Sequence, residues 1–232
     1  MNALPTSVVA VLGPPASGKT TVADALADAH GAAVFRVREA AHRMARTEPI
    51  IAAAVEATAD PLGWLPDLLA HDLARTALDA AVGRLVVLEG YPGNRVQAQA
   101  LALLLRARCR RLSVIELTAR PGTLAARLAR RRVCAVCDPA PGGPRRQAAT
   151  DASRPGRCGA CGAQLSVRDT DRGEKAELRQ ARYTANLPGV RAAFAHETEM
   201  AWHRLTTDPG SPNAAACVLT LLPTPPRERT PS

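Results

Sequence analysis

Short apolar runs alternate with helix-like segments along most of the chain. Runs rich in leucine or β-branched residues predict strands buried on both faces, at residues 7–12, 33–37, 85–88, 112–117 and 202–206. Helix-like patterns lie between them, at residues 20–30, 38–47, 66–82, 95–108 and 121–131. Strands that alternate with helices form βαβ units. We therefore expect an α/β fold in which a parallel sheet is covered by helices on both sides.

The alternation breaks between residues 133 and 167. This interval holds two Cys-x-x-Cys pairs and the stretch DPAPGGPRRQAATDASRPGR, whose proline, glycine, serine and arginine content is typical of a mobile loop. A helical pattern resumes near Glu174 and is expected to stop before Pro188. We expect a core made of residues 1–132 and 168–222, a small insert at 133–167, and a disordered tail at 223–232.

The length and hydropathy of the chain indicate a cytoplasmic protein. At 232 residues it is long enough for one sizeable core with a small inserted module. It has no apolar run of about 18 residues, the length that a membrane span requires. The opening residues, MNALPTSVVAVL, lack the charged segment that begins a signal peptide. We expect a monomer that does not enter a membrane.

The charge of the chain narrows the class of ligand. The formal charge of +9 and the pI of about 10.1 favour polyanions such as nucleotides, phosphates or nucleic acid. Alanine, arginine, glycine and proline dominate, however, as they do in compositionally biased genomes. Aromatic residues make up 3% of the chain, too few for a platform on which single-stranded nucleic acid stacks. A nucleic-acid partner is therefore not expected.

A glycine-rich loop follows the first predicted strand and opens the first helix. It fits the pattern G-x-x-x-x-G-K-[ST] and consists of Gly13, Pro14, Pro15, Ala16, Ser17, Gly18, Lys19, Thr20 and Thr21. Such a P-loop wraps triphosphate oxygens with backbone amides, while its lysine reaches the transferred phosphate and a hydroxyl meets magnesium. The alternative is a generic glycine turn. A P-loop alone leaves motors, switch proteins, transporter ATPases and small-molecule kinases open.

The two cysteine pairs predict a metal site. Cys134, Cys137, Cys158 and Cys161 have the spacing of a tetrahedral zinc centre with four thiolates and no open position. Such a zinc would be structural and would fold an insert that has little core of its own. A redox role is the alternative, although thioredoxin-like motifs occur singly at the start of a helix. Cys109 and Cys217 are interpreted as ordinary core residues.

Arginines flank the cysteine-bearing interval on both sides. Arg127, Arg131 and Arg132 precede it, and Arg168 and Arg179 follow it. Converging guanidinium groups stabilise the charge that phosphoryl transfer spreads over the equatorial oxygens. The alternative is that these arginines belong to a solvated face. Their place at both edges of an insert that could close as a flap favours the first interpretation.

Together these motifs resemble those of adenylate kinase and its nucleoside monophosphate kinase relatives, in the form with a zinc-bearing lid. The resemblance covers roughly residues 8–191 and includes the P-loop, a strand that ends in acid-Gly-aromatic-Pro, and R-x-x-x-R-R-V-C-x-x-C with C-x-x-C-G-x-x-L-x-x-R-D. It implies a P-loop kinase fold with the insert as lid. It also implies ATP and a nucleoside monophosphate as substrates, and magnesium and structural zinc as cofactors.

The resemblance implies a role for each motif residue. The P-loop would hold the ATP phosphates with Lys19 on the transferred group, and Arg127 and Arg131 would grip ATP from the lid. Arg168 and Arg179 would close over the moving phosphoryl group. Glu89, with Thr20, would position magnesium through water. The implied catalytic residues are thus Lys19, Arg131, Arg168 and Arg179.

The resemblance also implies an acceptor side built around residues 38–65. There Gln97 would read the acceptor base, and the remaining candidates are Arg38, His42, Arg43, Glu89 and Gly90.

Several positions depart from the family pattern. Ala16 and Thr20 stand where the family has glycines, and Thr170 stands where it has one acid of an aspartate pair. The family's Thr-Gly-Asp-x-x-Arg appears at 37–42 as Val-Arg-Glu-Ala-Ala-His, and its Gly-Phe-Pro-Arg appears at 90–93 as Gly-Tyr-Pro-Gly. Both arginines that would clamp the acceptor phosphate are absent, and such charge-assisted contacts are strong. We expect an intact donor half and an acceptor half that has changed its preference or weakened.

Two other functions stay open at this point. One is a small-molecule kinase of the same fold that acts on a non-standard nucleotide or metabolite. The other is a catalytically weak ATP-binding protein or zinc ribbon, of which salt-sensitive nucleic-acid binding without nucleotide turnover would be the sign.

Overall fold

The computed structural model describes residues 8–139 and 146–222. Their centre is a five-stranded sheet in the order β2-β3-β1-β4-β5, in which every neighbouring pair is parallel. The strands are β1 (Val8–Leu12), β2 (Ala33–Phe35), β3 (Val86–Glu89), β4 (Leu112–Thr118) and β5 (Met200–Thr206). The predicted α/β fold with a parallel sheet is confirmed. Ser7, the predicted start of the first strand, and the predicted disordered tail at 223–232 lie outside the described residues.

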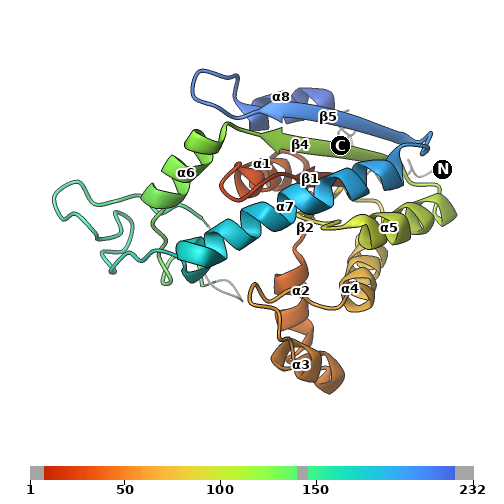
Figure 1. The fold of residues 1–232 in the computed structure, drawn as a ribbon, viewed down its shortest axis with the longest axis horizontal. Helices are drawn as coiled ribbons and strands as arrows, with labels where there is room; N and C mark the ends of the chain where they lie inside the picture. The colour runs from red at the N-terminus through yellow and green to blue at the C-terminus, as the bar shows by residue number, and fades with distance from the viewer. Residues whose placement is uncertain (1–7, 140–145, 223–232) are drawn as a thin grey trace, which may run out of the picture.

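Helices connect the strands, as the alternating pattern predicts. They are α1 (Lys19–His30), α2 (Val37–Met44), α3 (Pro49–Glu56), α4 (Asp67–Ala80), α5 (Arg95–Ala107), α6 (Pro121–Arg130), α7 (Gly173–Phe194) and α8 (Ala214–Leu221), with a short 3-10 turn at Asp169–Asp171. Figure 1 shows α2 and α3 projecting from one side of the sheet, and α6 leading into the loops of residues 131–139, which continue in residues 146–168.

Alternate side chains of each strand pack on opposite faces of the sheet. Val8, Ala10 and Leu12 of β1 share one core cluster with residues of α4, α5 and α7. Val9 and Val11 share the other cluster with residues of α1 and α8. Every residue of β1 is buried. Both faces of the sheet are thus covered, which explains why the strands read as continuous apolar runs.

The structure corrects the helix that was expected to stop before Pro188. Helix α7 continues through this proline to Phe194. The last turns are held by tertiary contacts, since Val190 and Phe194 are buried in the core against α5, and Arg191 donates to the buried carboxylate of Glu116 at 2.6 and 2.7 Å. Packing of this kind outweighs the lost backbone hydrogen bond and the clash that a proline introduces.

Helix α8 has no counterpart among the predicted helix ranges, whereas α3 lies inside the helical segment 38–65 that is predicted to bind the acceptor. Both are eight residues long and are made mostly of alanine and other small or aliphatic residues. Such segments lack the polar face that marks an amphipathic surface helix. Within the described residues, no helix is long and apolar enough to cross a membrane.

The parallel sheet brings several polar segments to one edge. Val11 of β1 lies opposite Glu89 of β3, so the P-loop that follows β1 and the acid that ends β3 are neighbours. β2 ends beside them, and Arg36 follows it directly. In open α/β sheets, ligands bind outside the carboxyl ends of the strands. A ligand-binding site is therefore expected at this edge.

Candidate active site

The P-loop, residues 13–21, joins β1 to α1 in a tight and strained turn. A Cβ on Gly13 would lie 2.4 Å from Ser17 Oγ and 2.8 Å from Leu117 O, so only glycine fits there. Ala16 has a φ of 63°, a left-handed conformation that costs an L-residue about 1–2 kcal/mol. Ser17 Oγ is buried and has no hydrogen-bond partner in the described part of the chain. Strain and unpaired polar groups of this kind gather at binding sites.

Lys19 folds back over the P-loop from the first position of α1. Its Nζ donates to the carbonyl oxygens of Gly13 at 2.7 Å and Pro14 at 2.8 Å. Burial lowers the pKa of Lys19 to about 7; the charge of Glu89 raises it in part, while nearby arginines lower it further. A bound anion would restore the charged form. The lysine is therefore well placed to meet a phosphate group.

Thr20, in the first turn of α1, meets Glu89 at the end of β3. Thr20 Oγ1 donates to Glu89 Oε1 at 2.6 Å. A hydroxyl and a carboxylate are the hard oxygen ligands that Mg²⁺ prefers, and Mg²⁺ usually keeps several of its waters when it binds. These two oxygen-bearing side chains fit a magnesium site in which waters mediate the contacts.

Asp171 brings two of the candidate arginines together. Its carboxylate is fully buried; Oδ2 accepts from Arg131 Nε at 2.7 Å, and Oδ1 accepts from Arg179 Nη1 at 2.6 Å. Arg131 follows α6 and Arg179 lies on α7, so the aspartate links the two sides of the 133–167 insert. The two guanidinium groups are held close to each other despite their like charge.

Arg168 lies next to this pair. In the described part of the chain its guanidinium donates to no other group, although Asp171 attracts it electrostatically. Burial, together with the charges of Arg131 and Arg179, lowers the pKa of Arg168 to about 10. A cation that is desolvated and lacks a direct partner gains strongly from a bound anion.

Arg127 connects α6 to the P-loop. Its Nη1 donates to Ala16 O at 3.3 Å and to Thr207 Oγ1 at 3.0 Å, and its Nη2 donates to Thr207 O. The segment after β5 thus approaches the P-loop through this side chain.

One cavity of about 1080 Å³ joins most of the predicted site residues. It is lined by residues 15–21 of the P-loop, Glu89, Arg127, Arg131, Arg168 and Arg179, and also by Thr207, Asp208, Ser211 and residues 212–215. Gly13 and Pro14 lie beneath this surface and are buried. The acceptor-side candidates do not line the cavity, with the exception of Glu89.

Arg38 is an acceptor-side candidate whose charge acts on the arginine cluster. It lies on α2 and its Nη2 donates to Leu62 O at 2.5 Å. Burial lowers the pKa of Arg38, and its charge contributes to lowering the pKa of both Arg168 and Arg179. On the same helix, His42 is half-buried and Arg43 is exposed.

Polar groups in and next to the turn after β3 form hydrogen bonds with other protein groups. Gln97 is buried; its Oε1 accepts from Gly93 N at 2.7 Å and its Nε2 donates to Asp67 Oδ1 at 2.7 Å. Gly90 has a φ of 72°, and its N donates to Val11 O at 2.9 Å. Gln97 therefore retains one N–H and one oxygen lone pair for any ligand.

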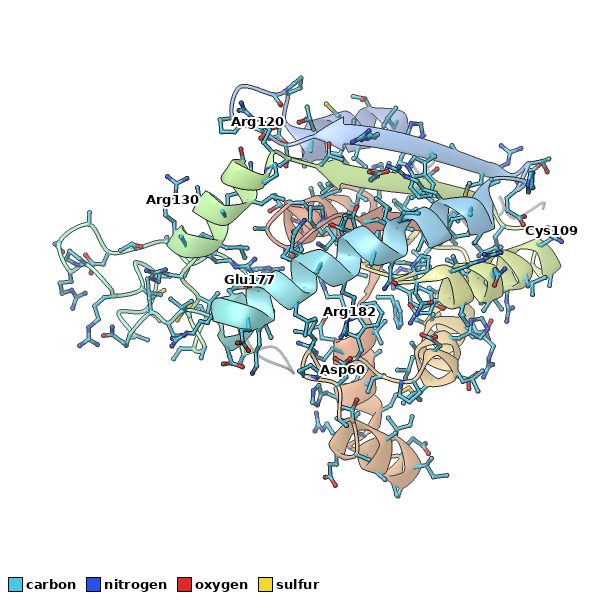
Figure 2. The ribbon with its side chains drawn as sticks, viewed as in Figure 1. Asp60, Cys109, Arg120, Arg130, Glu177 and Arg182 are labelled. Carbon is cyan, nitrogen blue, oxygen red and sulfur yellow. The ribbon has the colours of Figure 1, made fainter. Side chains whose placement is uncertain are left out.

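Trp64 packs against the same turn. A Cβ on Gly93 would lie 2.9 Å from the six-membered ring of Trp64, so the indole fills the space beside this glycine. Arg182 stacks over the indole at 4.8 Å and pairs with Asp60 at 2.8 Å. Figure 2 shows Asp60 and Arg182 side by side, between the loop that follows α3 and helix α7.

The four cysteines of the insert converge. Their sulfur atoms all lie within 4.8 Å of one another, with Cys134 and Cys158 buried and Cys137 and Cys161 exposed. Four thiolates around zinc, each at about 2.3 Å, leave neighbouring sulfurs about 4 Å apart. The cluster fits a zinc site, and its use of both pairs favours metal binding over redox chemistry. Cys109, interpreted from the sequence as a core residue, is instead exposed at the end of α5, and Cys217 is half-buried.

The sequence interpretation missed three residues that organise the site. Asp171 lies next to Thr170, which replaces one acid of the family's aspartate pair, and Trp64 is one of only two tryptophans in the chain. Arg36 lies inside the second predicted apolar run, 33–37, and directly follows the observed strand β2. A charged residue within an otherwise apolar run was thus a signal for Arg36.

Comparisons with known proteins agree with this geometry. A family model described as an AAA domain matches residues 8–135, which is more than half of the 232-residue chain. The chain belongs to this AAA domain family. The residues matched by this family model include the P-loop, Glu89 and Cys134, the first cysteine of the four-cysteine cluster.

Curated relatives of this chain are named adenylate kinase. The adenylate kinase of Novosphingobium aromaticivorans is 28% identical over 185 residues, which cover 78% of this chain and 84% of the relative. The adenylate kinase of an Anaeromyxobacter species is 29% identical over 81% of this chain and 86% of its own length. That of Streptomyces lividans is 27% identical over 74% and 84%, respectively. The resemblance to adenylate kinases is confirmed, and the comparisons support a nucleotide kinase.

Proposed function

We propose that this protein transfers the terminal phosphoryl group of ATP to a nucleoside monophosphate. The observation that carries the proposal is the cavity of about 1080 Å³ in which the P-loop and Lys19 face Arg131, Arg168 and Arg179. Phosphoryl transfer involves little covalent chemistry for the protein, and its catalysis depends on positioning and on charge stabilisation. A phosphate cradle opposite converging guanidinium groups is suited to that task.

The donor half would work as follows. Backbone amides of the P-loop and Lys19 hold the ATP phosphates, and Thr20 with Glu89 holds hydrated Mg²⁺, which neutralises phosphate charge. Arg127 and Arg131 bind ATP from α6. Thr207, Asp208 and residues 211–215, which also line the cavity, are placed to contact the base.

The transfer step would depend on Arg168 and Arg179. Asp171 already holds Arg179 and Arg131 in place, so little reorganisation is needed when charge develops on the phosphoryl oxygens. Arg168 supplies a desolvated guanidinium that gains a partner when the phosphoryl group arrives.

The acceptor half differs from the adenylate kinase pattern. Trp64 occupies the space beside Gly93, where the related enzymes are expected to place an arginine. Arg38 acts electrostatically on both Arg168 and Arg179 and would bind the acceptor phosphate in its place. Gln97 would contact the acceptor base, and none of His42, Arg43 and Gly90 lines the cavity. We propose that AMP is not the preferred acceptor.

The cysteine insert, residues 133–167, would act as a zinc-stabilised lid on a core made of residues 1–132 and 168–222. Its four sulfurs leave no position for a water, so the metal would be structural. Arg131 and Arg168 stand at the two ends of the insert, which supports a lid that carries arginines over the phosphates as it closes.

An assay of ADP formation from ATP and Mg²⁺ over a panel of nucleoside monophosphates tests the proposal. We expect turnover that is lost in Lys19→Ala and retained in Lys175→Ala; these are the two lysines of the chain. Turnover with none of the monophosphates, but with another hydroxyl- or phosphate-bearing metabolite, would favour the small-molecule kinase instead. Brisk phosphorylation of AMP at ordinary substrate levels would disprove the altered preference.

A further inference from the structure

Three carboxylates surround the guanidinium of Arg36 at the edge of the sheet. Arg36 Nε donates to Glu89 Oε2 at 2.5 Å, its Nη2 to Asp24 Oδ1 at 2.9 Å, and its Nη1 reaches Glu39 Oε2 at 3.4 Å. The carboxylates come from α1, α2 and the end of β3, three separate elements. Asp24 also accepts from Arg146 of the cysteine insert, through its second oxygen, at 2.8 Å.

This ion-pair cluster is well shielded from solvent. The side chain of Arg36 is 14% exposed and that of Glu89 is 10% exposed. Burial lowers the pKa of Arg36, but the charges of Glu89, Glu39 and Asp24 outweigh this effect and raise it. At this exposure each charge is screened less than it would be at the surface, so the cluster depends on having a cation at its centre.

Glu89 is held on both sides by this arrangement. One oxygen accepts from Arg36 and the other accepts from Thr20 Oγ1 at 2.6 Å. The orientation of the carboxylate is therefore fixed, with the oxygen that bonds Thr20 facing the P-loop cavity. Thr20 and Glu89 both line this cavity.

We propose that Arg36 is a positioning residue that stands in for a divalent cation among Asp24, Glu39 and Glu89. Its guanidinium orients Glu89 toward Thr20 and prevents free divalent cations from binding to the three carboxylates. The metal then enters the site with the nucleotide, a consequence that rests on the proposed function.

The size of the guanidinium supports this role. Carboxylate oxygens lie around its rim, roughly 4 Å from its central carbon, as expected from its own bond lengths and those hydrogen bonds. An Mg²⁺ ion that keeps its waters reaches second-shell carboxylates at about the same radius, the sum of a metal–water and a hydrogen-bond distance. Removing the guanidinium would leave three acidic groups arranged for a hydrated divalent ion.

The test is the binding of Mn²⁺, followed by electron paramagnetic resonance, to the whole chain without nucleotide. We expect Arg36→Met to gain one Mn²⁺ site near the P-loop. The Kd of this site should be at least tenfold lower than that of any Mn²⁺ site that the wild type has there. The double variant Arg36→Met/Glu89→Gln should lose this gain. Arg36→Lys keeps the positive charge and should behave like the wild type, and the exposed Arg84→Met is the matched control.

Positioning of Glu89 is read from the metal dependence of turnover. In Arg36→Met we expect the Mg²⁺ concentration for half-maximal rate, at saturating ATP, to shift at least threefold, with partial recovery in Arg36→Lys. Arg36→Gln, which retains hydrogen-bond donors, serves if the methionine variant does not fold.

A folded Arg36→Met or Arg36→Gln chain that binds Mn²⁺ no better than the wild type would overturn the inference. Because Mn²⁺ binding without nucleotide does not require turnover, this result is distinct from a failure of the proposed phosphotransferase activity.

Discussion

The six-membered ring of Trp64 lies where any side chain on Gly93 would have to go. A Cβ at position 93 would approach this ring to 2.9 Å. Overpacking a filled site costs about 1–3 kcal/mol. We therefore expect Gly93→Arg to lower the free energy of unfolding by at least this amount, measured by urea denaturation, and to leave AMP phosphorylation no better than in the wild type.

Removing the indole tests whether Trp64 sets the acceptor preference. In Gly93→Arg/Trp64→Ala the arginine has room, and we expect the KM for AMP to fall at least tenfold relative to Gly93→Arg alone. Trp64→Ala by itself is the control, because it opens space without adding a phosphate ligand. An unchanged KM in the double variant would show that the indole does not exclude an AMP clamp.

Asp171 holds Arg131 and Arg179 at one point. Asp171→Asn keeps the shape of the side chain but leaves two neighbouring guanidinium groups without their shared charge. We expect kcat to fall about 10²-fold and the free energy of unfolding to drop by about 3 kcal/mol. Asp169→Asn is the matched control, since this aspartate is 76% exposed and such surface changes stay within about 0.5 kcal/mol. Equal effects of both variants would contradict the assigned role of Asp171.

The four-cysteine cluster predicts one equivalent of zinc per chain. Cys158→Ser, or treatment of the wild type with a strong chelator, should release the metal and unfold the insert while the far-ultraviolet circular dichroism of the core persists. Cys109→Ser should keep its zinc, because Cys109 lies far from the cluster, at the end of α5. Metal analysis that finds under half an equivalent of zinc, with thiols reduced, would count against the site.

Ala16 carries a strained backbone in the P-loop, with a φ of 63°. Glycine adopts this conformation without the Cβ penalty, although it loses more entropy on folding. We expect Ala16→Gly to stabilise the chain by up to about 1 kcal/mol, which corresponds to a Tm increase of about 2–4 °C. Ala125→Gly, in the middle of α6, should instead lose about 1 kcal/mol. A lower Tm for Ala16→Gly would mean that the loop is not strained at this residue.

The ion pair of Asp60 predicts a dependence of stability on pH. Burial acts to raise the pKa of Asp60, but the hydrogen bond from Arg182 and two backbone N–H groups outweigh it and hold the pKa below its ordinary value of 3.8. The ionised form is thus favoured on folding, so its contribution is present above about pH 4 and is lost as the pH falls further.

Comparison with Asp60→Asn isolates this contribution. At pH 6 we expect the wild type to be more stable than the variant by about 1–2 kcal/mol, and the difference should shrink as the pH falls below 4. A difference that does not change between pH 6 and pH 3 would show that the carboxylate charge is not responsible.

The local pattern of the sequence was sufficient for the architecture, and it also marks the P-loop. Buried parallel strands are continuous apolar runs, and the P-loop is one contiguous segment whose turn geometry depends on its own residues, such as Gly13. The zinc cluster could also be predicted, since each Cys-x-x-Cys pair sets two ligands by spacing alone. These features are encoded over short distances along the chain.

The tertiary structure decided how distant segments share charges and space. The sequence places Asp171, Arg36 and Trp64 in three unrelated stretches, and their roles depend on partners such as Arg131, Glu89 and Gly93 that lie far away in the chain. Helix α7 passes through Pro188 because residues beyond it are buried against α5, an effect that no local propensity contains. Local chemistry thus determined the strands, the P-loop and the cysteine pairs, while long-range packing determined which charges are paired and how the space beside Gly93 is filled.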